Sequence, residues 1–429
     1  MRKMKDSGIE WIGEIPEEWE VKKLSFLYDN IGSGTTPPTS NSFYYEGDIN
    51  WVNTGDLNDG YLYESQKSIT REALEKFSTL KEYDENSIII AMYGATIGKV
   101  AISKIKFTAN QACCVLSQAA KCDSKYVYYW LLQNKENLIS LSYGGGQPNI
   151  SQETIKSLKI QLPSTVEEQS RIAEYLDKRC TEIDTVINAK EITKEKLKEY
   201  RQSIIYEDVT KGLAKNVPMK DSGIEWIGEI PEEWDIEKLK YHADFNPTVD
   251  TSKFNDEDEV SFVPMENLKN GYHITSTAEF SNVKKGYVQF INGDILIAKV
   301  TPCFENGNLA IANNLISGIG FGSTEINVIR CKSIETKYLF YYFQNRKFIE
   351  RATHDMYGVA GLKRLIPSFI PESYYPIPTI IDQHQIADYL DNRCAEIDSV
   401  ISANKITIDK LKEYRQSVIY EAVTGKTEI

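Results

Sequence analysis

Cysteine and histidine are scarce in this chain and follow no metal-binding pattern. The 7 cysteines are an odd number with no C-x-x-C pair, and the 4 histidines are scattered. Structural zinc sites need these residues at short, repeated spacings, and disulfide frameworks need paired cysteines in small secreted chains. We therefore expect neither. The adjacent Cys113 and Cys114 are interpreted as core residues that point to opposite faces of one strand.

Long apolar runs are also missing. No stretch approaches the roughly 20 apolar residues that span a bilayer, and the first ten residues lack the apolar core of a signal peptide. We expect a cytoplasmic protein with no membrane partner.

Positive charge is in deficit. The chain carries 49 Lys and Arg against 62 Asp and Glu, so its formal net charge is 49 − 62 = −13. This argues against a protein that binds nucleic acid through bulk charge, but it leaves room for a local site. Residues 25–165 carry 12 basic against 14 acidic residues, and residues 241–380 carry 13 against 15, so each segment is only −2. The remaining −9 lies outside them.

Motifs for catalysis are absent. The segment Gly94–Lys99 (GATIGK) resembles a phosphate-binding loop, but it has one residue too few between its glycines and is followed by Val100 instead of Ser or Thr. Neither the F-x-G-x-G nor the N-P-P-[FY] motif of adenine methyltransferases occurs. We predict a binding protein whose partners perform the chemistry.

The chain contains two copies of one plan. Met4–Trp19 and Met219–Trp234 have the same sixteen letters, and Gln169–Thr210 matches Gln383–Thr424 at 29 of 42 positions. The segments between these repeats are nearly equal in length, yet their letters hardly match. An internal repeat of this kind predicts a pseudo-two-fold arrangement of two similar domains that carry different surfaces. We place the boundaries at 1–164, 165–214, 215–379 and 380–429, which alternate between domain and helix.

The second repeat is predicted to form a helix of about 40 residues, roughly 60 Å long at 1.5 Å per residue. Its apolar residues recur three and four positions apart. We expect the two copies to pack antiparallel as an imperfect coiled coil and to serve as a spacer; the alternative is two helices that each pack on their own domain. The predicted seam of the first copy consists of Leu176, Ile183, Lys190, Leu197 and Ile204 at one position and Ile172, Arg179, Val186, Thr193 and Tyr200 at the other.

Ser170 aside, the early differences between the copies define one face of the helix. They recur at spacings of 3, 4, 3, 4, 3, 3 and 4, as expected for a single helical stripe, which we expect to face solvent. This stripe contains Arg171, Glu174, Lys178, Thr181, Thr185, Asn188, Glu191 and Glu195.

Both variable segments are predicted to mix helix and strand. Ser87–Met92 and Asp294–Val300 are buried strands, each followed by a turn and a second extended segment. Lys125–Leu132 and Lys337–Phe343 are matching aromatic helices. The predicted fold class is α+β, with two mixed α/β domains joined by two long antiparallel coiled-coil helices.

Several segments resemble the specificity subunit of type I restriction-modification systems. They are the block DSGIEWIGEIPEEW, the run from Gly34 to Leu57 with GTTPP and INWVNTGDL, GATIGK at Gly94, ANQA at Ala109, GSTE at Gly322 and the helix start EEQSRIAEYLD at Glu167. The resemblance covers essentially the whole chain.

This resemblance implies a subunit that recognises double-stranded DNA through two target recognition domains. Each domain would read one half of a bipartite, asymmetric sequence, while the paired helices set the distance between them and dock two modification subunits. Those partners would bind S-adenosylmethionine and methylate adenine, and restriction/translocase subunits would add ATP- and Mg-dependent translocation and cleavage. The chain itself would need no cofactor and perform no catalysis.

DNA contacts are expected from exposed polar side chains in turns and at strand ends. Lys and Arg neutralise phosphates, whereas Asn, Gln, Thr and Arg read base edges in the major groove. Thr35, Ser323 and Thr324 have turn capping as an alternative role. The candidates are Thr35, Thr36, Lys67, Arg71, Thr96, Lys99, Asn110, Gln111, Gln147 and Asn149 in the first domain, and Lys299, Thr301, Asn306, Ser323, Thr324, Lys363 and Arg364 in the second.

Two other functions are considered. One is a free-standing DNA-modifying enzyme with an unrecognised site, and the other is a coiled-coil scaffold without DNA affinity. The target bases do not follow from side-chain types alone, because DNA shape also contributes to recognition.

Overall fold

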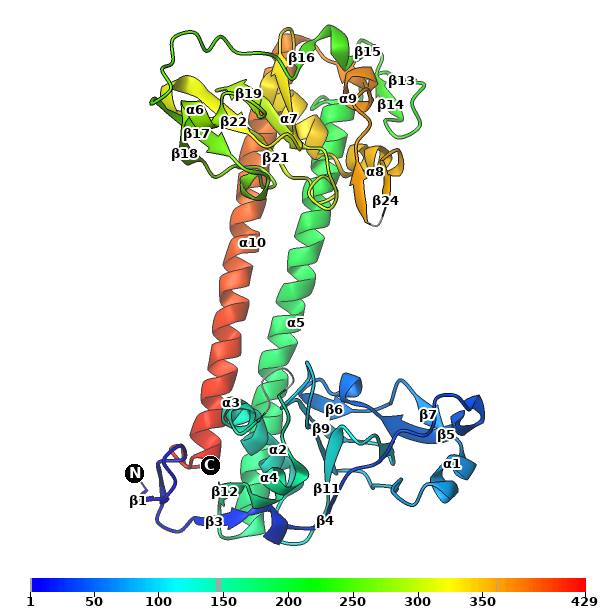
Figure 1. Ribbon diagram of the computed structural model, residues 1–429, viewed down its shortest axis with the longest axis vertical. Coiled ribbons are helices and arrows are strands. Elements are labelled where there is room, and N and C mark those ends of the chain that lie inside the picture. The colour runs from blue at the N-terminus through cyan, green and yellow to red at the C-terminus, as the bar shows by residue number, and fades with distance from the viewer. Residues whose placement is uncertain (1, 144–147, 360) are drawn as a thin grey trace. The chain divides into compact units, whose positions relative to one another are not determined.

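The computed structural model describes residues 2–143, 148–359 and 361–429 (Figure 1). The chain divides into two compact units. Unit 1 comprises residues 1–190 and 406–429, and unit 2 comprises residues 191–405. Each unit therefore contains its own domain together with parts of both long helices.

Unit 1 is a mixed α/β domain with a short N-terminal hairpin. Its helices are α1 (Arg71–Lys76), α2 (Ser124–Gln133), α3 (Lys135–Ser140), α4 (Gln152–Ser157), the first part of α5 (Val166–Lys211) and the last part of α10 (Ile380–Val423). Its strands are β1 (Met4–Asp6), β2 (Glu14–Pro16), β3 (Glu20–Lys23), β4 (Tyr28–Gly32), β5 (Tyr45–Val52), β6 (Gly60–Leu62), β7 (Ser68–Ile69), β8 (Ile88–Ala91), β9 (Val100–Ser103), β10 (Thr108–Ala109), β11 (Cys113–Ala119) and β12 (Lys159–Leu162).

The main sheet of unit 1 has five strands in the order β4-β11-β8-β9-β6, and a second sheet has the order β10-β5-β7. The predicted strand Ser87–Met92 is confirmed as β8. Cys113 and Cys114 lie in β11 and are both buried, as predicted. Cys114 packs in the large core beneath α2, while Cys113 points to a smaller cluster between the two sheets.

Unit 2 repeats this architecture. Its helices are the second part of α5, α6 (Phe280–Val283), α7 (Thr336–Gln344), α8 (Arg346–His354), α9 (Phe369–Glu372) and the first part of α10. Its strands are β13 (Met219–Asp221), β14 (Glu229–Pro231), β15 (Asp235–Lys238), β16 (Ala243–Phe245), β17 (Glu259–Val263), β18 (Ser276–Glu279), β19 (Val288–Ile291), β20 (Ile295–Ala298), β21 (Leu309–Ile311), β22 (Ile319–Gly322), β23 (Ile326–Cys331), β24 (Tyr357–Val359), β25 (Leu362–Arg364) and β26 (Tyr374–Ile377).

The two main sheets of unit 2 have the orders β16-β23-β20-β21 and β18-β17-β22-β19. The strand predicted at Asp294–Val300 is β20, and the aromatic helices predicted in the two domains are α2 and α7. The aromatic residues Tyr126 in α2 and Tyr338 in α7 are completely buried. The Tyr126 hydroxyl lies 3.2 Å from the Val423 carbonyl oxygen, and the Tyr338 hydroxyl lies 2.9 Å from the Val209 carbonyl oxygen. The end of one long helix is thus fixed in the same way in each unit.

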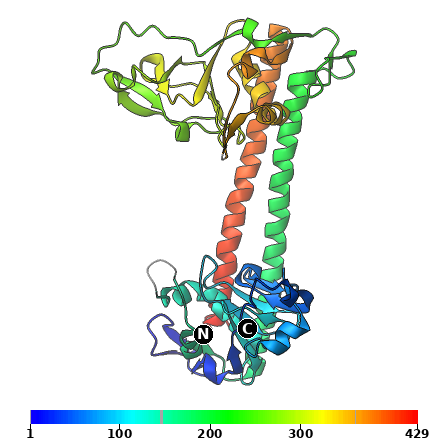
Figure 2. The same ribbon diagram turned by 45° about the vertical axis from the view of Figure 1, so that its right-hand side comes forward.

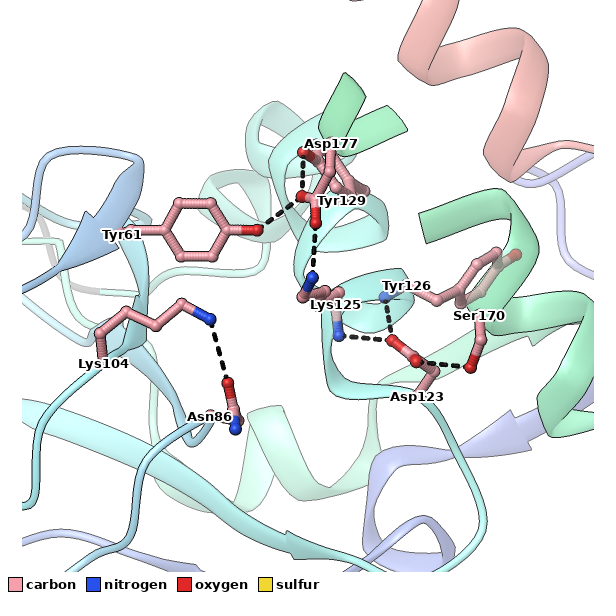
Figure 3. A network of polar contacts seen from close by, with 9 residues as sticks. All are labelled: Tyr61, Asn86, Lys104, Asp123, Lys125, Tyr126, Tyr129, Ser170 and Asp177. Carbon is pink, nitrogen blue, oxygen red and sulfur yellow. Dashed lines mark hydrogen bonds and ion pairs between the residues drawn. The ribbon is translucent and has the colours of Figure 1, made fainter. Parts of the chain in front are cut away.

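One carboxylate joins α5 to the domain of unit 1. Asp177 accepts hydrogen bonds from the hydroxyls of Tyr61 at 2.5 Å and Tyr129 at 2.8 Å, and it pairs with Lys125 Nζ at 2.6 Å (Figure 3). Burial alone would raise the pKa of Asp177, but the hydrogen bonds from Lys125, Tyr61 and Tyr129 outweigh it, so the pKa is lowered. The ionised carboxylate therefore stabilises this junction.

Unit 2 has the same junction at Asp391 of α10. Its carboxylate pairs with Lys337 Nζ at 2.6 Å and accepts a hydrogen bond from the Tyr341 hydroxyl at 2.7 Å. Because Asp177 and Asp391 occupy the same place in the repeat, the helices are attached to both domains by one chemistry.

The long helices pair antiparallel within each unit, as predicted. In unit 1, Ile183 and Ile187 of α5 pack against Ile408 and Leu411 of α10, and the two helix segments lie side by side in both views (Figures 1 and 2). Arg415 also pairs with Asp184 at 3.0 Å. These are contacts between the helices themselves, so the alternative of two helices that pack only on their own domains is wrong.

Unit 2 contains the equivalent ion pair with the roles of the helices exchanged. Arg201 of α5 lies 3.2 Å from Asp398 of α10. In the repeat, Arg201 corresponds to Arg415 and Asp398 to Asp184. The internal pseudo-two-fold repeat is therefore present in the ion pairs between the helices as well as in the amino-acid sequence.

Part of the predicted seam is wrong. Val186 was expected between the helices, but its side chain is 45% exposed. Tyr200 is 48% exposed, yet it is hydrogen-bonded to Arg393 of the other helix, and the equivalent Tyr414 hydroxyl accepts from Arg179 at 3.2 Å. Several seam positions are polar, so the apolar contact between Ile183, Ile187, Ile408 and Leu411 is a short cluster. The divergent stripe is exposed as predicted, apart from the half-buried Glu191. No helix in the described part of the chain is long and apolar enough to cross a membrane.

Candidate nucleic-acid interface

Strand order brings distant segments of unit 1 together at one end of its main sheet. β4 ends where its antiparallel neighbour β11 begins, and β8 ends beside the start of both β11 and β9. The loops that follow or precede these strand ends therefore share one surface, which we call the unit 1 strand-end surface. It contains Thr35, Thr36, Thr96, Lys99, Asn110, Gln111 and Asn149.

Side-chain contacts confirm that these loops meet. Thr36 and Gln111 are 75 residues apart in sequence, yet their side chains are hydrogen-bonded at 2.6 Å. The Asn110 side-chain amide donates to Asn53 Oδ1 at 2.9 Å, because β5 and β10 are parallel and both residues directly follow their strands. Amide and hydroxyl groups thus form a connected polar surface of the kind that reads base edges.

Unit 2 builds the same surface from different residues. β16 ends beside the interior of β23, and β20 ends where β23 and β21 begin. The hairpin β24-β25 joins this end of the sheet through an antiparallel bridge between Val300 and Arg364. The unit 2 strand-end surface contains Lys299, Thr301, Asn306, Ser323, Thr324, Lys363 and Arg364.

Charge is concentrated at one point of the unit 2 surface. Arg364 holds Glu325 with two hydrogen bonds, from Nε to Oε2 at 3.1 Å and from Nη2 to Oε1 at 2.5 Å. The hydrogen bond from Arg364 lowers the pKa of Glu325, and the charge of Lys299 adds to this effect. The carboxylate is therefore ionised at neutral pH, and the guanidinium is held in one orientation.

The expectation that every candidate is exposed in a turn or at a strand end is wrong for two residues. Thr301 is only 6% exposed, because its hydroxyl donates to the Gly361 carbonyl at 2.9 Å and accepts from the Lys363 amide at 2.8 Å. Arg71 is the first residue of α1, two residues after β7 ends, so it lies in a helix near the start of β5 and outside the unit 1 strand-end surface. Whether either residue touches DNA stays a prediction.

The remaining candidates are placed as follows. Lys67 is exposed beside Trp51 near the end of β5, since its carbonyl accepts from the Trp51 amide. The Ser323 hydroxyl accepts from the Glu325 amide at 3.2 Å, which is the capping role considered as its alternative. Gln147 lies outside the described residues.

Two kinds of residue were missed by sequence reasoning. Asn53 contacts Asn110 but lies in a strand-like run of the sequence, and only the parallel pairing of β5 and β10 shows the contact. Tyr143 and Tyr357 are 58% and 56% exposed, and they form equivalent antiparallel pairs with Asn149 and Arg364 next to the strand-end surfaces. In both units a Tyr-Gly pair comes shortly after a helix, and this shared pair is the sequence signal that could have indicated the two tyrosines.

Comparison with known families matches the repeat. The family model for the type I restriction modification DNA specificity domain matches twice, at residues 16–199 and 231–409. The chain belongs to this family. Each match covers one domain and most of the long helix that follows it, so two specificity domains account for the two copies seen in the sequence.

Curated relatives are specificity subunits of type I restriction enzymes. The EcoAI specificity subunit of Escherichia coli is 40% identical over 163 residues, which is 37% of this chain and 27% of that protein. The EcoEI specificity subunit of the same species is 36% identical over the same shares. The chain thus matches about a quarter of the length of these two relatives. The MjaIX specificity subunit of Methanocaldococcus jannaschii is 27% identical across 97% of this chain and 95% of its own length.

Solved structures share the fold at low identity. A chain from a structure on complex assembly and conformational transition of a type I R-M system has a TM-score of 0.72 at 16% identity, covering 96% of this chain and 99% of its own. The HsdS subunit of Thermoanaerobacter tengcongensis has a TM-score of 0.53 at 16% identity, covering 96% and 98%. The family and its fold are therefore shown by sequence and by structure.

Proposed function

We propose that this chain is the DNA-recognition subunit of a type I restriction-modification complex. Units 1 and 2 each read one half of a bipartite, asymmetric sequence in double-stranded DNA. The observation that carries the proposal is that both units present the same strand-end surface on the same scaffold but with different side chains. Two unlike surfaces on one scaffold suit two unlike half-sites.

The long helices are proposed to dock two copies of one partner, the modification subunit. Three large apolar side chains are exposed on both helices at unchanged positions of the repeat. Their exposed fractions are also nearly equal in the two copies, at 45% and 49% for Val186 and Val400, 57% and 57% for Ile192 and Ile406, and 48% and 48% for Tyr200 and Tyr414. Exposed apolar side chains that repeat on both helices suit the same partner surface used twice.

Catalysis is assigned to the partners. The modification subunits would bind S-adenosylmethionine and methylate adenine, and the restriction/translocase subunits would use ATP and Mg. This chain would hold no cofactor. We place the chain in the cytoplasm, because its proposed DNA target and partner subunits would be there.

DNA binding tests the proposal directly. Because the −9 surplus lies outside the two domains, the isolated chain is expected to bind DNA weakly, and the assembled complex is expected to bind its target specifically. Fluorescence anisotropy at physiological salt, with and without the modification subunits, measures both affinities. A complex that binds all sequences equally would support the scaffold alternative, and methyl transfer by the isolated chain would support the enzyme alternative.

A further inference from the structure

Three residues at each strand-end surface can be matched between the units through their backbone hydrogen bonds. In unit 1 the Met92 amide donates to the Ala112 carbonyl at 2.8 Å, and in unit 2 the Lys299 amide donates to the Glu325 carbonyl at 3.0 Å. Each bond joins the end of the central strand to the residue just before the next strand. Lys299 is therefore equivalent to Met92, and Glu325 to Ala112.

A third pair of equivalent residues comes from the segments that bond to these strand ends. The Ile150 amide donates to the carbonyl of the strand-end residue in unit 1 at 2.8 Å, and the Leu365 amide does the same in unit 2, also at 2.8 Å. The residues just before them, Asn149 and Arg364, also form equivalent antiparallel bridges to this strand end. Asn149 and Arg364 therefore occupy the same place.

The chemistry at these three places differs completely between the units. Unit 1 has one amide and no charge, whereas unit 2 has two cations and one anion. The uncharged trio is Met92, Ala112 and Asn149, and the charged trio is Lys299, Glu325 and Arg364.

The Arg364 guanidinium has donors to spare. Of its five N–H groups, Nε–H and one Nη2–H point to Glu325, which leaves both Nη1–H groups and the second Nη2–H. These remaining donors lie at the outer end of the fork, in the geometry that grips guanine O6 and N7 in the major groove. Arg364 is 49% exposed and Glu325 only 27%, so the free end of the fork faces solvent from a partly covered support.

The backbone beneath Arg364 is also fixed. The buried Thr301 accepts from the Lys363 amide with its hydroxyl, and its own amide donates to the Lys363 carbonyl at 3.0 Å. The next amide along the chain, that of Leu365, is bonded to the strand end as described above. A base-reading side chain on this hairpin pays little entropy on binding because its support is already ordered.

We propose that Arg364 is a base-reading residue that recognises a guanine in the half-site of unit 2, and that Glu325 is a positioning residue that orients it. The proposal rests on the function proposed above. It also assigns a difference between the half-sites: the equivalent place in unit 1, with Asn149, is not a guanine reader.

The test uses the full chain assembled with its modification subunits. The variant Arg364→Lys keeps the charge but removes the fork, and Glu325→Gln keeps the size but weakens the hold on Arg364. The matched control is Arg351→Lys, because Arg351 of α8 pairs with Asp355, the residue just after that helix, and the two side chains are similarly exposed at 47% and 30%. Sequencing of DNA methylated by each complex gives the recognised letters, and thermal melting shows that each variant is folded.

We expect Arg364→Lys to relax one G·C position in the half-site of unit 2, with discrimination against the other bases falling about 5- to 150-fold. The other half-site and the gap should stay unchanged. Glu325→Gln should relax the same position to a smaller extent, and the Arg351 control should change no letter. Relaxation at that position by Glu325→Gln distinguishes positioning from a purely structural role.

Two results would overturn the inference. One is that both variants recognise the same bases as the unaltered complex, with the same discrimination against other bases, which would make the Arg364–Glu325 pair a structural ion pair only. The other is relaxation at an A·T position. If the unaltered complex itself showed no sequence preference, the proposed function would fail instead, so the two failures are distinguishable.

Discussion

Asp208 is the most consequential difference between the two copies of the long helix. It occupies the place of Ala422, which is 1% exposed in the core of unit 1. In unit 2 the Asp208 Oδ2 atom is buried and has no hydrogen-bond partner among the described residues. Burial, with a smaller contribution from the neighbouring charge of Glu207, raises the pKa of Asp208 to about 7. We predict that Asp208→Ala stabilises unit 2.

The sign of the pH dependence follows from the raised pKa. An unfolded Asp titrates near 3.8, whereas folded Asp208 keeps its proton to about 7. The folded state therefore binds more protons between pH 4 and 7, so stability falls as the pH rises through this window and is constant above it. The full shift of 7 − 3.8 ≈ 3 pH units corresponds to at most about 4 kcal/mol. Because the side chain is partly exposed, we expect about 1–2 kcal/mol at pH 8.

Amide hydrogen exchange measures this effect locally. Peptides from the end of α5, residues 204–211, should gain protection in the Asp208→Ala variant at pH 8 but not at pH 4, after correction for intrinsic exchange rates. The end of α10, with Ala422, serves as an internal reference in the same sample. The reverse variant, Ala422→Asp, should lose about 3–5 kcal/mol there, because it buries an unpaired charge.

Two outcomes would refute this reasoning. The first is a wild-type end of α5 whose protection does not decrease between pH 4 and pH 8. The second is an Asp208→Ala variant whose protection at pH 8 equals that of the wild type.

Two further predictions concern the helices. Asp177→Asn should lower the free energy of unfolding by about 1–2 kcal/mol at pH 7 and by less at pH 3. The pKa of Asp177 is lowered in the folded state, so the stabilisation by its carboxylate is lost as the pH falls through that folded-state pKa. Urea denaturation at both pH values checks this, and an equal loss at both would contradict it. Seven residues inserted after Lys190 and after Asn404 should lengthen each helix by about 10.5 Å and widen the unspecified gap by about three base pairs. Sequencing of methylated sites checks the second prediction, and a gap of unchanged length in an active complex would contradict it.

Much of the fold could be predicted because its signals are local or repeated. The three-and-four spacing of apolar residues predicted the long helices. The adjacent Cys113 and Cys114 predicted that both faces of β11 are buried. The exposure of Val186 could not be predicted, because it depends on how far apolar contact extends between two helices.

The candidate surface was predictable only in part. Residue types and turns indicated most of its members, but the burial of Thr301 depends on a hairpin 60 residues further along the chain. The contact between Asn53 and Asn110 depends on parallel strand pairing, which leaves no pattern in the sequence. Non-local pairing therefore limits what sequence reasoning can say about the surface.

The central claim is that each unit reads its own half of one DNA sequence. It is tested most directly by replacing residues 241–380 with the equivalent segment of a relative and sequencing the methylated sites of cells that carry the original gene, the replacement or no copy. We predict that methylation at the bipartite site disappears without the gene, and that the replacement changes one half of the site and leaves the other half and the gap unchanged. A replacement that altered both halves, or methylation that persisted without the gene, would contradict the claim.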